Sequence, residues 1–301
     1  MKPAGAGASP LLRATLFALL STASFACTGL SVRALTLAGI PTLESAFFRG
    51  AISLAMTAPW LMQAGFAGIR TTMPVRHFLR SAANGAGMVL WFAGLGMLAL
   101  GDALALQFTM PLWVVLAAAL FLGEKVDAMR IGVLALGFAG VLIVVRPGAG
   151  GETGGIGALL VLGGAAFYAL NTIMMKPMSR TESPAAMVFH LNVWYVPAFG
   201  ACLPFVWVTP GWEHVLWLAL LGIAGASAHF FLTRALALAD ASYVSPFEFL
   251  KLPIGAGLAF LLFGDVSDLW TWVGAAVIFA AGMLNARHEG TRQRRAGGDG
   301  A

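Results

Sequence analysis

The sequence predicts an all-α integral membrane protein with ten transmembrane helices, arranged as two inverted five-helix repeats. Three observations lead to this prediction: an apolar composition, a series of long apolar runs, and a motif that occurs twice. Of the 301 residues, 59% are hydrophobic and only 10% are charged, and the mean hydropathy is +0.85. Because a soluble domain carries about 25% charged residues, this chain has too few charges to cover a surface that faces water.

The apolar runs are long enough to cross a membrane, which takes about 20 residues of helix. The connections between the runs are short, so we expect no separate soluble domain. In chain order, the expected helices cover residues 14–32, 50–69, 81–101, 103–123, 131–145, 153–175, 191–212, 215–233, 241–264 and 269–286.

The basic residues predict the orientation of these helices. With the N-terminus in the cytoplasm, only Arg33 and Arg146 of the 18 Lys and Arg residues fall on the outer side. Arg49 and Lys251 lie within helices, and all the others fall on the inner side. Since basic residues favour the cytoplasmic side, both termini are expected there. The Ala- and Arg-rich composition favours a bacterial cytoplasmic (inner) membrane.

A repeated motif divides the chain into two halves. Residues 98–103 read LALGDA, and residues 236–241 read LALADA. Pro111 and Pro253 follow at corresponding places in the two halves. Because each half holds an odd number of helices, the second half enters the membrane upside down relative to the first. Inverted repeats are typical of transporters, in which the substrate site lies near the midplane where the halves meet.

The repeat sets the expected domain boundaries. We expect a first five-helix repeat over residues 1–150 and a second over residues 151–288. Residues 289–301 are basic and rich in glycine, which predicts a disordered cytoplasmic tail with some attraction to anionic lipid.

Two segments make the chain resemble a known family. Residues 46–50 read AFFRG, which places an arginine in the second helix, and residues 110–144 read MPLWVVLAAALFLGEKVDAMRIGVLALGFAGVLIV. With five plus five helices, these segments are similar to the EamA family of the drug/metabolite transporter superfamily, over about residues 10–288. The second half departs from the family pattern, with FGD in place of a second LGE and His190 opposite Arg49.

The resemblance implies a ten-helix basket around a central cavity and the transport of small metabolites, often by export. We therefore expect a secondary transporter of a small polar or amphipathic metabolite, such as an amino acid, that works by alternating access and exports its substrate. One alternative is a flippase for a lipid-linked head group, which would use the same fold. A second alternative is an intramembrane enzyme with Glu248, Lys251 and His190 as acid–base groups.

Glu248 and Lys251 are the first candidates for a substrate site. They lie within an apolar run, three residues apart, so they share a helix face. A charge at the bilayer centre costs about 2.5–3.5 kcal/mol on insertion scales, so such residues face a cavity or a partner. Lys251 is expected to meet the substrate and Glu248 to meet an amine or a proton. The alternative is a structural pair whose two charges neutralise each other.

Other polar and aromatic residues in the apolar runs complete the expected site. Arg49 lies in the second helix, and the family resemblance favours a role for it in the cavity. His190, its counterpart in the second half, can titrate near neutral pH. Each of these residues has the alternative role of tying helices together. The remaining candidates are Gln107, Trp91, Tyr168 and Asn171.

Several chemistries have no support in the sequence. No G-x-x-x-x-G-K-[ST] motif for ATP hydrolysis occurs, and no His/Cys/Asp cluster has the spacing of metal ligands. We expect no cofactor, no metal, no nucleic-acid partner and no enzymatic activity. The expected partners are a small-molecule substrate and the lipid bilayer, with protons as a further candidate. The sequence leaves a monomer and a homodimer equally open.

Overall fold

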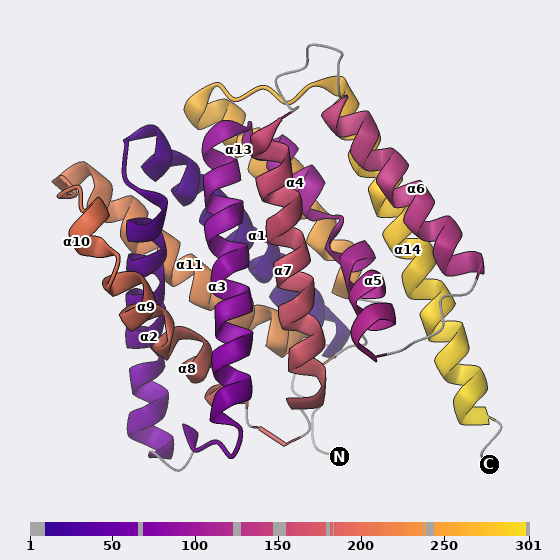
Figure 1. Ribbon diagram of the computed structural model, residues 1–301, viewed down its shortest axis with the longest axis horizontal. Coiled ribbons are helices and arrows are strands. Elements are labelled where there is room, and N and C mark those ends of the chain that lie inside the picture. Colours follow the sequence, from indigo (N-terminus) through magenta and orange to yellow (C-terminus); the bar gives the residue numbers. More distant parts are fainter. Residues whose placement is uncertain are drawn as a thin grey trace, which may run out of the picture.

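The computed structural model describes residues 10–65, 69–122, 128–146, 155–178, 181–182, 184–236, 238 and 244–298. Over these residues the chain forms helices and no strand. The helices run between the two ends of one bundle, and α1 begins at the same end at which α14 finishes (Figure 1).

The helices follow one another with short connections. The first half of the chain forms α1 (Pro10–Leu37), α2 (Thr42–Ala64), α3 (Pro74–Met97), α4 (Leu100–Gln107), α5 (Met110–Leu122) and α6 (Ala128–Val145). The second half forms α7 (Ile156–Met178), α8 (Pro184–Val193), α9 (Tyr195–Gly200), α10 (Leu203–Val206), α11 (Trp212–Leu236), the 3₁₀ helix η2 (Ser245–Leu250), α13 (Lys251–Phe263) and α14 (Leu269–Gly298).

Among the described residues, four helical segments are long and apolar enough to cross a membrane. This finding agrees with the α-helical membrane protein that the sequence predicts. The segments are Leu11–Leu37, Leu100–Ala117, Ile156–Met175 and Trp212–Leu232.

Prolines explain why several predicted helices are interrupted. A proline has no N–H to donate to the carbonyl four residues earlier, and its ring clashes with that carbonyl. Three helices end four residues before a proline, and η2 ends at Leu250, three residues before Pro253. Not every proline acts in this way, since α2 continues through Pro59. The three pairs of helix end and proline are Gln107 and Pro111, Val193 and Pro197, and Gly200 and Pro204.

Some helix ends differ from the sequence-based expectation. Helix α3 begins at Pro74 rather than at residue 81. Its first turns contain His77 and Arg80, which are polar but buried, so they lie outside the apolar run that was used to place the helix. An apolar run cannot locate a helix end that carries buried polar residues. At the C-terminus, α14 continues to Gly298, where the sequence predicts disorder from residue 289. The Arg, Gln and Ala residues of this segment have high helix propensity.

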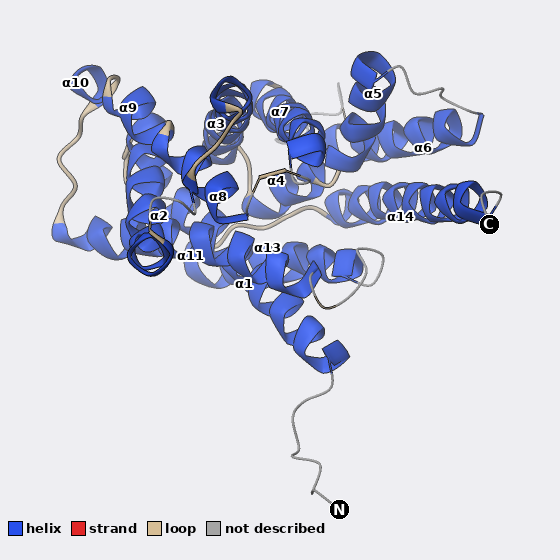
Figure 2. Cartoon of the chain, turned by 90° about the horizontal axis from the view of Figure 1, so that it is seen from below, coloured by secondary structure: helices blue, strands red, loops and turns tan. Residues whose placement is uncertain are grey.

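The helices pack in two layers. Helix α3 packs along α7, α1 packs along α11, and α6 packs along α14. Seen from below, α3, α7 and α5 form one layer and α11, α1 and α13 form the other (Figure 2). Helix α2 contacts α9 and α11 at one side of the bundle, and the α6–α14 pair lies at the opposite side.

The connection between α13 and α14 holds several helix ends together. It begins at Gly264, whose φ of 71° is in the left-handed region that favours glycine. Asp265 accepts two hydrogen bonds from the Arg33 guanidinium of α1, at 2.9 and 2.8 Å. Arg33 also donates to the carbonyl of Leu95, at the end of α3. Asp268 forms an ion pair with Arg146, at the end of α6.

Glycines allow the closest helix contacts. A Cβ built at Gly140 of α6 would lie 2.7 Å from Ile278 Cγ1 and 3.0 Å from the carbonyl oxygen of Gly274, both in α14. Gly87 of α3 and Gly164 of α7 approach each other in the same way. Small residues let membrane helices pack with their backbones in contact.

We expect Gly140→Ala to destabilise the protein by about 1–3 kcal/mol, the cost typical of overpacking a close contact. Gly132→Ala is the matched control, because Gly132 is on the same helix and a Cβ there would meet nothing within 4 Å. The measurement is the melting temperature in detergent. Equal melting temperatures for the two variants would contradict the close α6–α14 contact.

Candidate functional site

Glu248 and Lys251 lie at the junction between η2 and α13. Glu248 is in the 3₁₀ helix, and Lys251 is the first residue of α13. Lys251 Nζ donates to Glu248 Oε2 at 3.3 Å. The lysine side chain is 14% exposed and the glutamate side chain 39% exposed. The two charges therefore contact each other at a helix interruption, where the regular α-helical hydrogen bonding changes.

Two aromatic rings lie close to the Lys251 ammonium. Nζ is 5.0 Å from the ring centroid of Phe25 on α1 and 6.0 Å from that of Phe108, between α4 and α5. His229 on α11 meets Phe25 nearly at right angles, with the ring centroids 5.4 Å apart. Both phenylalanines are within the range in which a cation is attracted to an aromatic face. The pair thus lies near aromatic side chains from three other segments: α1, the α4–α5 connection and α11.

Arg49 of α2 lies in the same interior region. Its Nη1 is 3.1 Å from Met88 Sδ on α3, and a Cβ at Gly225 of α11 would lie 2.9 Å from its Nε. Nε is buried and has no hydrogen-bond partner among the described residues. His229 is within electrostatic range of both Arg49 and Lys251. A buried guanidinium with an unpaired N–H can donate to an acceptor on a ligand.

Tyr168 and Asn171 lie about one turn apart on α7. Tyr168 faces Gly87 of α3, next to the Met88 that Arg49 contacts, and it is within electrostatic range of Arg49. Asn171 Oδ1 is buried without a partner among the described residues. Both α7 candidates therefore lie on the side of the helix near α3.

Gln107 is the last residue of α4 and is partly buried. Its neighbour in sequence is Phe108, whose ring faces Lys251. Gln107 therefore lies at the interruption of its own helix, close to the interruption that holds the Glu248–Lys251 pair.

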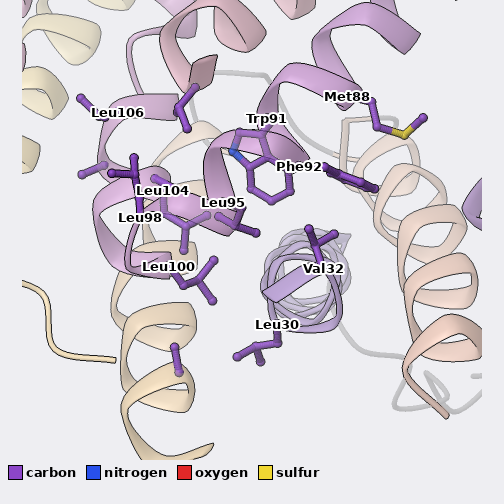
Figure 3. Packing of buried hydrophobic residues seen from close by; sticks show 14 of the residues in the cluster. Leu30, Val32, Met88, Trp91, Phe92, Leu95, Leu98, Leu100, Leu104 and Leu106 are labelled. Carbon is purple, nitrogen blue, oxygen red and sulfur yellow. The ribbon is translucent and has the colours of Figure 1, made fainter. Parts of the chain in front are cut away.

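Trp91 belongs to the apolar core. It is 5% exposed and packs with Phe92, Leu95 and Leu104 in the largest cluster of buried side chains (Figure 3). Its Nε1 is buried without a partner in the described part of the chain. These contacts favour a packing role for Trp91 rather than the substrate contact expected from the sequence, although its indole N–H has no described acceptor.

His190 lies in a different cluster, between α8, α3 and the connection between α2 and α3. Its Nε2 is 2.9 Å from the carbonyl oxygen of Ile69, and its ring is 4.6 Å from that of His77. Ser81 of α3 donates to the backbone carbonyl of His190. His190 thus ties helix ends together, and its described contacts do not include the Glu248–Lys251 pair.

Glu182 joins the cluster from the connection between α7 and α8. Its Oε1 accepts from Thr71 Oγ1 at 2.7 Å and from the Thr72 N–H at 3.4 Å. Its Oε2 lies 3.5 Å from Nε2 of His77, which is fully buried. Burial by itself raises the pKa of Glu182, but the interactions with Thr71, His77 and Thr72 outweigh burial and lower the pKa below 4.5.

The structure therefore divides the predicted site residues into groups. Glu248, Lys251 and Gln107 lie around two helix interruptions. Arg49 and Tyr168 lie near neighbouring residues of α3, Asn171 lies one turn further along α7, and Trp91 and His190 lie elsewhere. Phe25 and His229 are not among the residues that the sequence analysis singles out. Nor is the buried Tyr195, whose hydroxyl donates to Asn84 Oδ1. Nothing in their local sequence separates these residues from the other aromatic residues of an apolar chain.

Comparison with known proteins gives a consistent result. The EamA-like transporter family model matches residues 12–146 and 155–287. A riboflavin transporter of Rhizobium johnstonii is 34% identical over 85% of this chain and 84% of its own. An S-adenosylmethionine uptake transporter of Rickettsia bellii is 29% identical over 81% of this chain and 83% of its own. A crystal structure with 17% identity and a TM-score of 0.62 covers 90% of this chain and 96% of its own, which indicates a similar fold.

We expect the Glu182 carboxylate to make stability depend on pH. A lowered pKa in the folded protein means that the contribution is present above pH 4.5 and is lost as the pH falls below that value. Glu182→Gln should destabilise the protein at pH 7 by about 1.5–3 kcal/mol, which is typical for hydrogen bonds to a charged group. The difference from wild type should shrink in acid, as measured by melting temperature in detergent.

Glu213→Gln is the control for this experiment, because the Glu213 side chain is 74% exposed in the first turn of α11. It should change stability little at any pH. A Glu182→Gln variant as stable as wild type at pH 7 would contradict the assigned interactions.

Proposed function

The chain belongs to the EamA-like transporter family, and from that premise we propose that it moves a small metabolite with a flat heteroaromatic ring, such as riboflavin, across the membrane by alternating access. Its family makes the chain a transporter rather than an enzyme, so the intramembrane enzyme considered from the sequence is wrong. The observation that carries the proposal is the Glu248–Lys251 pair at a helix interruption, beside the rings of Phe25 and Phe108.

The relatives and the charges of the interior support this choice of substrate. Riboflavin and S-adenosylmethionine both combine a flat heteroaromatic ring with hydroxyl groups. S-adenosylmethionine also carries a sulfonium cation, which the nearby positive charges of Arg49 and Lys251 would repel. Riboflavin is neutral and offers carbonyl acceptors to the same N–H donors. It therefore suits the interior better than S-adenosylmethionine or the amino acid that the sequence suggests.

The proposed architecture is ten membrane spans in two inverted repeats around a central cavity. If the helices that prolines interrupt are joined, the described helices group into ten segments, which supports this number of spans. The family model matches the chain twice, close to the predicted repeats at residues 1–150 and 151–288. Helix contacts also support the repeats, because a two-fold relation that exchanges α1 with α7 and α3 with α11 turns the α3–α7 contact into the α1–α11 contact. The same relation exchanges α6 with α14, which pack together.

We place both ends of the chain in the cytoplasm of a bacterial cell with the protein in the inner membrane. The distribution of basic residues supports this orientation, as does the common end of the bundle at which α1 begins and α14 finishes. The connection with Asp265 and Asp268 then lies on the outer side, where its ion pairs bind α1 and the end of α6, and Arg33 links it to α3 by a hydrogen bond to the Leu95 carbonyl.

The sequence suggests export, but one relative is named as an uptake transporter. In alternating access the substrate gradient and any coupled gradient set the direction, so this proposal covers uptake and export alike. Coupling to protons and assembly as a monomer or homodimer are not required by it. The flippase alternative has no support among the relatives reported above.

We expect purified protein in liposomes to move riboflavin, with flux followed by flavin fluorescence against protein-free liposomes. Excess unlabelled riboflavin should compete with labelled riboflavin, and S-adenosylmethionine should compete less well. Flux equal to that of protein-free liposomes would contradict riboflavin as the substrate.

The charged pair is tested in the same assay with Glu248→Gln, Lys251→Met and the double variant. If the pair binds substrate, each single change should lower flux at least ten-fold, while the melting temperature stays near that of wild type. The double variant should not recover flux. If the pair is only structural, a single change leaves an unpaired buried charge and destabilises the fold, and the double variant should restore stability and flux together.

A further inference from the structure

We propose that Phe25 is the surface on which the flat ring of the substrate stacks, and that the Lys251 ammonium leaves this ring face when the substrate binds. The inference rests on the proposed function, because it names the residue that recognises the ring of a heteroaromatic substrate. It follows from four side chains at the interrupted helices: Phe25, Phe108, His229 and Lys251.

The face of Phe25 is occupied by a cation in this structure. Lys251 Nζ lies 5.0 Å from the Phe25 centroid and 6.0 Å from that of Phe108, so it lies within reach of both rings. A flat heterocycle prefers the same face of an aromatic ring as an ammonium group does. The substrate ring and the ammonium therefore compete for one position.

His229 fixes the orientation of the Phe25 ring. The two rings meet at 83° with centroids 5.4 Å apart, an edge-to-face arrangement that aromatic pairs favour. His229 is on α11, which packs along α1. A ring held from a neighbouring helix loses little freedom on binding, which makes it a suitable stacking surface.

Lys251 keeps a partner when it leaves the ring. Glu248 Oε2 is 3.3 Å from Nζ, and both side chains extend from the same helical junction. The ammonium can remain hydrogen-bonded to Glu248 while it turns away from Phe25, and it can then donate to a carbonyl acceptor on the substrate. The exchange leaves no charge unpaired. An unpaired charge in the membrane interior would be costly.

This arrangement selects for the shape and electronic character of the substrate. Any flat heteroaromatic ring can stack on Phe25, whereas an amino acid or a sugar alone has no such ring. Removing an aromatic stacking partner weakens the binding of a base roughly 5- to 150-fold. Ring recognition by Phe25 therefore accounts for a measurable part of substrate affinity.

The test compares Phe25→Leu with wild type in detergent, by quenching of flavin fluorescence on binding. Two probes are used: riboflavin, and lumiflavin, which keeps the ring system but lacks the hydroxylated chain. Phe25→Leu should bind both probes about ten-fold more weakly, and by the same factor, because the loss concerns the ring that they share. Phe25→Met serves as a second variant without a ring if the leucine variant fails to fold.

Phe17→Leu is the matched control. Phe17 lies on the same helix, is also partly buried, and stacks on Phe231 with centroids 6.1 Å apart. It should bind both probes as wild type does. Wild-type affinity in Phe25→Leu or Phe25→Met would overturn the inference and leave the proposed function intact. A wild-type protein that binds neither probe would overturn the proposed function, and the inference would fall with it.

Discussion

Two interrupted helices are the constraint on which the interior of this protein depends. Pro111 and Pro253 each remove a backbone N–H, and the helices that contain them stop and restart just before the proline. In a membrane, backbone groups freed in this way must be satisfied inside the protein. The two interruptions face each other, since Phe108 at one lies near Lys251 at the other. Polar side chains can lie at these interruptions because the regular helical hydrogen bonding is already broken there. Discontinuous helices form substrate sites in many transporters for this reason.

Arg33 and Arg49 differ in how their guanidinium groups are hydrogen-bonded. Arg33 donates from Nε, Nη1 and Nη2 to Asp265 and a backbone carbonyl, at a place where several helices end. Such a bidentate pair holds elements together and leaves little for a ligand. Arg49, in contrast, has a sulfur acceptor and a buried Nε without a described partner. Buried polar groups are normally hydrogen-bonded, so we propose that substrate supplies the missing acceptor at Arg49, which lies in the interior near the Glu248–Lys251 pair. The same reasoning applies to Asn171.

The sequence was sufficient for the family, the membrane-protein class and the placing of Glu248 and Lys251 close together on one helical segment. Apolar runs and charge counts report on the bilayer, and spacing along a helix reports on local contacts. Contacts between segments that are far apart in the sequence could not be predicted from it. Phe25 meets His229 and Lys251 only after three helices pack, and it is one of 21 phenylalanines without a distinguishing local signal.

His190 was paired with Arg49 by repeat position, but its ring turns toward His77 and Ile69 at a helix end. Alignment of repeats locates a residue along a helix and leaves its neighbours undetermined.

We propose that substrate binds between the interrupted helices, and protection of an introduced thiol from labelling measures this binding. Cys27 and Cys202 are first replaced by serine, and Gln107→Cys then introduces one thiol beside Phe108. Glu213→Cys, at an exposed helix end, provides the control. We expect riboflavin, at concentrations that saturate transport, to slow the labelling of residue 107 several-fold and to leave the labelling of residue 213 unchanged. Labelling of residue 107 at the same rate with and without riboflavin, in a variant that still transports it, would rule out this binding place.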